Sequence, residues 1–135
     1  MRNWTGTILA LSLFASVAQA HHSLSNYDQG RNVSADGVIE EFHFVNPHPV
    51  LMIGVTDPSG IRQIWRLEMD NLHELDDIGI SKTTFKYGDK VTISGKPDRK
   101  EPREIYLRRL DRPSDGLHYE QIGSSPRLTR TSGPG

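Results

Sequence analysis

One alternating segment with a single change of phase constrains the fold of this chain more than any other feature. Between residues 33 and 45, apolar residues and glycine fall on odd positions up to Ile39 and on even positions at Phe42 and Phe44. Side chains of a β-strand point to alternate faces, so a change of phase requires one extra residue. The pattern therefore predicts a strand with a β-bulge near Glu40-Glu41, and a bulge bends the strand that contains it.

Shorter segments with the same alternation follow along the chain. They predict strands over residues 50–56, 61–69, 90–94 and 104–110. A short helix is expected over residues 71–78, with Asp70 or Asn71 as its cap and Gly79 at its end. The fold class is therefore mainly β, a small five-stranded OB-like barrel with one short helix between the third and fourth strands. A five-stranded sandwich is the alternative, and the barrel is favoured because it closes its own edges.

The first 20 residues have the composition of a cleavable export signal. Arg2 supplies a positive charge, residues 7–17 form an apolar run, and Ala18-Gln19-Ala20 follows with small residues. The run is shorter than the roughly 20 apolar residues that a membrane-spanning helix needs. We therefore expect cleavage between Ala20 and His21, a location in the periplasm or outside the cell, and no membrane-spanning segment.

The remaining chain has the length of one domain. Residues 21–32 are polar and without periodicity, which predicts an extended N-terminal arm. Residues 33–112 would form the barrel, and residues 113–135 are predicted to be a polar, disordered tail because they are rich in proline, glycine and serine. The chain has no cysteine, so an apolar core has to hold the fold together without disulfides.

Several short motifs occur in an order that is similar to that of a known family. They are His21-His22-Ser23, Asn46-Pro47-His48, Trp65-Arg66-Leu67-Glu68, Gly88-Asp89-Lys90-Val91 and Gly95-Lys96-Pro97. Over residues 21–110 the chain thereby resembles a family of small exported bacterial proteins of unknown function. The resemblance implies an exported OB-like barrel and no particular activity. The chain departs from the family at Pro49-Val50, where an aromatic residue is usual, and at Gly79-Ile80, where Gly-Trp is common.

The balance of charges and the motifs argue against two functional classes. The formal net charge is −1, whereas domains that bind nucleic acid usually present a clearly basic surface. Basic residues between positions 96 and 112 alternate with acidic ones, which predicts a solvated strand with salt bridges. Ser23 and Ser25 lie near histidines, but neither has the glycine-framed turn of a hydrolase nucleophile. We therefore expect a binding module and not an enzyme.

Cleavage before His21 would create a candidate metal site. His21 would then carry a free amine beside its imidazole, and together these two groups can chelate a metal ion. A further imidazole would complete a three-nitrogen site of the kind that Cu(II) prefers. The amine has a reference pKa of about 7.7 to 8.0, so a metal ion can displace its proton near neutrality. The candidate metal ligands are therefore His21, His22 and His48, with copper favoured, because two prolines stiffen the turn that holds His48.

The same histidines also have plain structural interpretations. His21 and His22 could be solvated polar residues, and His48 could fix its turn through a hydrogen bond to a backbone carbonyl. His43 and His73 are expected to face solvent.

The alternative function is an interaction module that binds a protein or glycan partner in the cell envelope without metal, as OB barrels bind extended ligands across one face. The aromatic residues discriminate between the two hypotheses. An exposed cluster of Phe44, Trp65 and Tyr106 would favour the interaction module, and burial of all three would weaken it.

Overall fold

A computed structural model describes residues 22–131, with the side chains of His22 and Ser23 left out. The elements along the chain are α1 (His22–Ser25), β1 (Val33–His43), β2 (Val50–Thr56), β3 (Arg62–Glu68), α2 (Leu72–Asp77), β4 (Lys90–Pro97), β5 (Glu104–Arg112), β6 (Leu117–Ile122) and β7 (Ser125–Arg130). Among the described residues, no helix combines the length and the apolar character needed to cross a bilayer.

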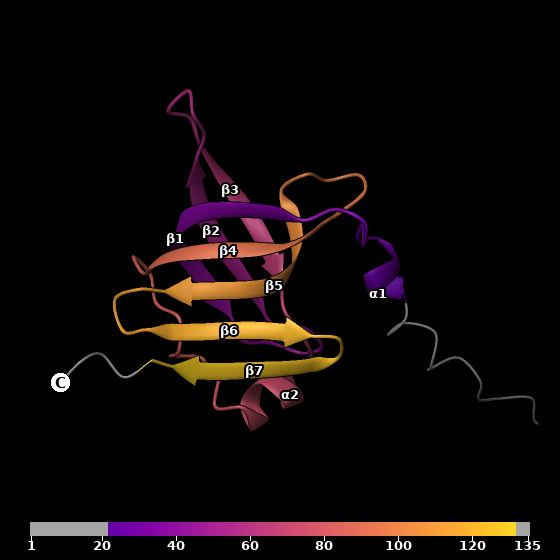
Figure 1. The fold of residues 1–135 in the computed structure, drawn as a ribbon, viewed down its shortest axis with the longest axis vertical. Coiled ribbons are helices and arrows are strands. Elements are labelled where there is room, and N and C mark those ends of the chain that lie inside the picture. Colours follow the sequence, from indigo (N-terminus) through magenta and orange to yellow (C-terminus); the bar gives the residue numbers. More distant parts are fainter. Residues whose placement is uncertain (1–21, 132–135) are drawn as a thin grey trace, which may run out of the picture.

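The strands form one mainly antiparallel sheet that closes on itself. Their order is β3-β2-β1-β4-β5-β6-β7, and a parallel pairing between β3 and β5 closes the first five strands into a barrel. The helix α2 lies between β3 and β4 in the chain, so the predicted five-stranded barrel with one intervening helix is confirmed. Figure 1 shows β1, β4, β5, β6 and β7 as one layer of nearly parallel ribbons, with β2 and β3 crossing behind it.

The predicted bulge in β1 lies where the sequence indicates. The register with β2 shifts between Ile39 and Glu41, which leaves Glu40 as the extra residue. Upstream of the bulge, β1 pairs with β4 from Val33 to Val38, and around and beyond it the strand pairs with β2 as far as His43. The bend allows one long strand to belong to both sides of the barrel. A turn with a cis Asn46–Pro47 bond then leads to β2.

The predicted disordered tail over residues 113–135 is wrong for most of its length. The chain forms the hairpin β6–β7 instead, and β6 continues the sheet by pairing with residues 109–112 of β5. The reason is a short alternation that the polar composition hides: Leu117 and Tyr119 are buried, whereas His118 between them faces outward. Gly123, with a φ of 59°, supplies the left-handed residue that the tight turn needs.

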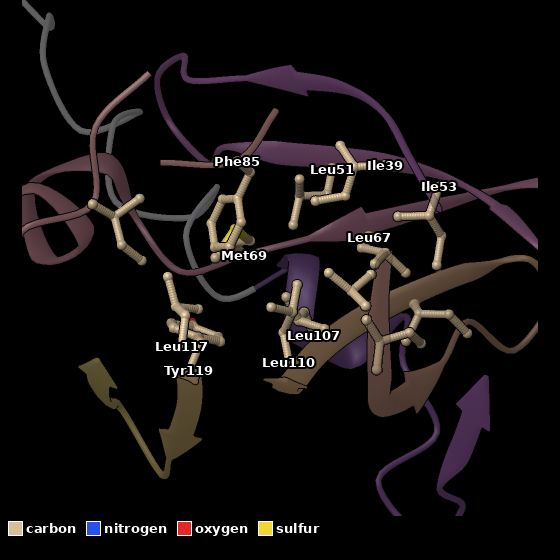
Figure 2. Packing of buried hydrophobic residues seen from close by; sticks show 14 of the residues in the cluster. Ile39, Leu51, Ile53, Leu67, Met69, Phe85, Leu107, Leu110, Leu117 and Tyr119 are labelled. Carbon is tan, nitrogen blue, oxygen red and sulfur yellow. The ribbon is translucent and has the colours of Figure 1, made fainter. Parts of the chain in front are cut away.

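The side chains that fill the barrel come from every barrel strand and from β6. The cluster contains Ile39, Leu51, Ile53, Leu67, Met69, Phe85, Leu107, Leu110, Leu117 and Tyr119, among others. In Figure 2, Leu117 and Tyr119 of β6 lie at one end of this cluster and point into the same interior as Met69 and Phe85. The hairpin is therefore part of the core and not an appendage on its surface.

Strand β5 changes its neighbour at Arg108. Residues 104–106 pair with β3, and residues 109–112 pair with β6. The register with β4 passes from Ser94↔Arg109 to Gly95↔Leu107, so Arg108 is the extra residue of a second bulge. Gly95 permits the close approach of the two strands, because a Cβ there would overlap the Tyr106 carbonyl oxygen. A bulge re-aims the side chain that it contains, which sets Arg108 apart from its neighbours.

Candidate functional site

The N-terminal arm is held against the outside of the barrel. The prediction of a wholly extended arm over residues 21–32 is wrong, because α1 forms a short helical turn at its start. Downstream of α1, the Asp28 amide donates to the Pro97 carbonyl at 2.8 Å and the Arg99 amide donates to the Asn26 carbonyl at 2.9 Å. Tyr27 is only 3% exposed, and its hydroxyl donates to Glu68 Oε2 at 2.8 Å. This anchor keeps α1 close to the ends of β3 and β4.

Within residues 22–131, one hydrogen-bond partner is defined for His48. Its Nδ1 lies 3.0 Å from the carbonyl oxygen of Met69, and a carbonyl can only accept, so Nδ1 carries the proton and donates. In a neutral imidazole the other nitrogen, Nε2, is then an acceptor with a free lone pair. The bond is the structural role predicted for His48, and it also fixes the tautomer that a metal ligand requires.

The remaining predicted ligands cannot be compared with His48. His21 lies outside the described residues, and only the main chain of His22 is described. Among the side chains that the structure does describe, no group of three histidine or carboxylate residues is arranged to hold a metal ion.

Three further histidines are placed clearly. His43 is exposed as predicted, and its Nε2 lies 2.6 Å from Glu41 Oε2. His73 is exposed on α2, also as predicted. His118, to which the sequence assigned no role, lies on β6 with its Nδ1 2.6 Å from Asp111 Oδ1 on the neighbouring strand. Sequence analysis missed this pair because it placed His118 in a disordered tail.

A cleft of about 450 Å³ lies between α1 and the β6–β7 turn. It is lined by Leu24, Gln29, Asp70, Tyr106, Arg108, Gly123 and Ser124. Asp70 directly follows Met69, the residue whose carbonyl holds His48. The cleft is therefore connected to His48 through Asp70 and Met69, and to the start of the described residues through Leu24.

Asp70 is a buried acid whose two oxygens both accept hydrogen bonds. It is 8% exposed, its Oδ1 accepts from the Asn71 amide at 2.7 Å, and its Oδ2 accepts from Gln121 Nε2 at 2.6 Å. Gln121 in turn accepts from the Tyr119 hydroxyl at 2.9 Å. Burial without such donors would strongly disfavour the charged form. The hairpin β6–β7 thus supplies the side chain that steadies Asp70, which sequence analysis did not find.

Asp70 and burial raise the pKa values of two neighbouring groups, Glu74 and Tyr106. A hydrogen bond with Asp70 raises the pKa of Glu74, and desolvation and the Asp70 charge add to the rise. Glu74 Oε2 is buried, and no donor among the described residues reaches it. A proton on this carboxyl would remove the unfavourable buried charge. Burial, reinforced by the Asp70 charge, raises the pKa of Tyr106, so this phenol remains a neutral donor at physiological pH.

The aromatic residues that discriminate between the two hypotheses do not form an exposed cluster. Tyr106 is 4% exposed, because the Tyr27 ring covers it at a centroid distance of 5.6 Å. Phe44 and Trp65 are partly buried and pack against the core. The exposed aromatic cluster that would have favoured a protein or glycan interaction module is therefore absent from the described residues.

Of the basic residues between positions 96 and 112, Arg109 and Arg112 form ion pairs among the described residues, with partners outside that segment. Arg109 lies 3.1 Å from Glu120. Arg112 is buried, and it lies 2.7 Å from Asp89 and 2.8 Å from Asp115. These two arginines connect the barrel to the hairpin and its base, and their partners are not the acidic residues that alternate with them in the sequence.

The fold is a small closed β-barrel with a cleft of about 450 Å³ between α1 and the β6–β7 turn. The chain belongs to a family of unknown function (DUF6152), whose model matches residues 10–105. No curated protein matches the chain. The family match ends inside β5, so the hairpin β6–β7 lies beyond it. Family membership assigns no activity to the protein.

Proposed function

We propose that the protein is an exported binding module that holds a copper ion through its mature N-terminus. The donors would be the amine and imidazole of His21, with His22 and His48 supplying further imidazoles. Copper is favoured because Cu(II) prefers nitrogen ligands in a tetragonal arrangement and heads the affinity order of the divalent ions. The chain has no cysteine, so a site for a soft or borderline metal ion has to use nitrogen donors.

The hydrogen bond from His48 to the Met69 carbonyl is the observation that carries the proposal. It fixes the ring in a half-buried turn and leaves the lone pair of Nε2 free to bind a metal ion. Histidines that bind metal ions typically donate their other ring N–H to a carbonyl or carboxylate in this way. Among the described residues the exposed His73 has no such partner, and it is not expected to bind a metal ion.

The anchoring of the arm supports the same proposal. Tyr27 and the main-chain bonds around it hold Leu24 at a cleft that Asp70 also lines, and Asp70 directly follows the carbonyl that orients His48. Leu24 comes two residues after His22. The short length of chain between Leu24 and the proposed ligands limits how far they can move from this end of the barrel.

Titration of Cu(II) into the processed protein tests the proposal. A form with one extra alanine before His21 displaces the terminal amine from that residue, and its affinity should fall by more than the 10- to 100-fold typical of losing a hydrogen-bond partner of a metal ligand. His48→Asn keeps a donor for the Met69 carbonyl but removes Nε2, so it should weaken copper binding without lowering the stability of the fold. His73→Asn is the matched control and should leave the affinity unchanged.

Intact-mass measurement on the same samples controls for processing. The expected mass corresponds to a chain that begins at His21. Equal copper affinity of the processed and extended forms would contradict the proposal, because the proposed chelate depends on the amine. Processing at another peptide bond would contradict it as well.

A further inference from the structure

The cleft between α1 and the β6–β7 turn carries opposite charges that do not pair with each other. Asp70 and Arg108 both line it, yet among the described residues no ion pair within 4.0 Å joins them. Each is held by other groups. Gln121 and the Asn71 amide bind the Asp70 carboxylate, whereas Arg108 Nη1 donates to the Gly123 carbonyl at 3.1 Å. The two charges are therefore fixed in place and separated.

Tyr106 lies between these charges. The Arg108 guanidinium lies over its ring, 5.5 Å from the centroid, and the charges of both Asp70 and Arg108 act on its hydroxyl. None of the side-chain hydrogen bonds found among the described residues involves the Tyr106 hydroxyl, and burial and nearby charges alone account for its raised pKa. Leu24 adds an apolar side chain at the α1 side of the cleft. The cleft thus combines an anion, a cation, an unused donor and an apolar wall.

Each charge retains capacity for a ligand. A guanidinium has five N–H donors, and Arg108 uses one of them on the Gly123 carbonyl. A carboxylate offers about four lone-pair sites, and at Asp70 the Asn71 amide, Gln121 and the Glu74 carboxyl occupy about three of them. The volume of about 450 Å³ lies within the range of small-molecule sites, roughly 300 to 1,000 Å³. Few convergent polar groups in an otherwise apolar cleft are typical of such sites.

We infer that this cleft binds a small zwitterion of the free amino-acid type. The cationic nitrogen of the ligand pairs with Asp70, its anionic oxygens pair with Arg108, and its apolar body lies against Leu24. The guanidinium suits a carboxylate because its planar donors can bind both oxygens. This site uses none of the proposed copper ligands and does not depend on them.

Three related probes test the charge requirement on the unmodified protein. Leucine carries both charges on an isobutyl body, isoamylamine lacks the carboxylate, and isocaproate lacks the amine. Each is added at about 20 mM, enough to detect millimolar binding, to isotope-labelled protein in the presence of a metal chelator. Leucine should shift the amide resonances of Leu24, Gly123 and Ser124, and the two single-charge probes should not. Absence of a leucine shift, or equal shifts with all three probes, would overturn the inference.

A variant then ties the binding to the cleft. Arg108→Gln keeps a donor for the Gly123 carbonyl but removes the cation, and leucine affinity should fall about tenfold or more, as for loss of a charged hydrogen bond. Arg109→Gln is the matched control, since Arg109 pairs with Glu120 and does not line the cleft. Unchanged affinity in Arg108→Gln, or an equal loss in both variants, would show that leucine binds elsewhere.

Discussion

The two segments that flank the barrel are attached to it in different ways. The hairpin β6–β7 continues the sheet and places Tyr119 in the core, with 0% of its surface exposed. The N-terminal arm lies on the outside and depends on Tyr27 and a few hydrogen bonds near Asp98. Buried apolar area dominates stability, so the hairpin belongs to the folding unit. The arm can detach without opening the core, and it is the segment that leads to the proposed copper ligands.

The largest expected effect comes from the hairpin. Tyr119→Ala removes a fully buried ring and the hydroxyl that donates a hydrogen bond to Gln121. It should lower the free energy of unfolding by about 3 to 5 kcal/mol. Denaturant titration measures this change. Tyr87→Ala is the matched control, because Tyr87 is 79% exposed and its loss should change stability by less than about 0.5 kcal/mol. Similar values for the two variants would mean that the hairpin adds nothing to the core.

A smaller effect is expected from the arm. Tyr27→Phe removes one hydrogen bond to Glu68 and should cost about 1 kcal/mol. Hydrogen exchange separates its consequences: the Asp28 amide, bonded to Pro97, should exchange faster, whereas the Tyr119 amide should keep the protection that reflects global unfolding. Equal acceleration at both amides would remove the distinction between arm and hairpin.

The smallest expected effect is a pH dependence at the base of the hairpin. A hydrogen bond from Arg112 is the main reason why the pKa of Asp115 falls from 3.8 to about 2. Because the folded pKa lies below the unfolded one, the resulting stability is complete above about pH 4 and disappears as pH falls toward 2. Asp115→Asn should therefore flatten the loss of stability across this window in denaturant titrations. An unchanged acid profile would show that the pair contributes nothing measurable, as exposed ion pairs often do.

The barrel was predictable because each of its strands has a local alternation of apolar and polar residues. The phase change between Ile39 and Phe42 located the bulge, and Asn71 and Gly79 marked the ends of α2. The hairpin was not predictable from composition, since prolines, glycines and serines surround the brief alternation at Leu117 and Tyr119. Its burial arises only because β5 offers a free edge beyond Arg108.

The candidate site was predictable only in part. His48 could be singled out from its prolines, but its partner is a carbonyl 21 residues away, which no local pattern indicates. The pairing of Asp70 with Gln121 spans 51 residues and joins the end of β3 to β6. Arg108 enters the cleft through a bulge whose position depends on the register with β4. Such relations follow from the closed sheet and not from any motif.

The EPR spectrum of Cu(II) bound to protein that begins at His21 tests the central proposal most directly. The account predicts one tetragonal species with splitting from several coordinated nitrogens, which changes when an alanine precedes His21 and also in His48→Asn. A spectrum that is identical in the extended protein would contradict the account, since copper would then be bound without the terminal amine.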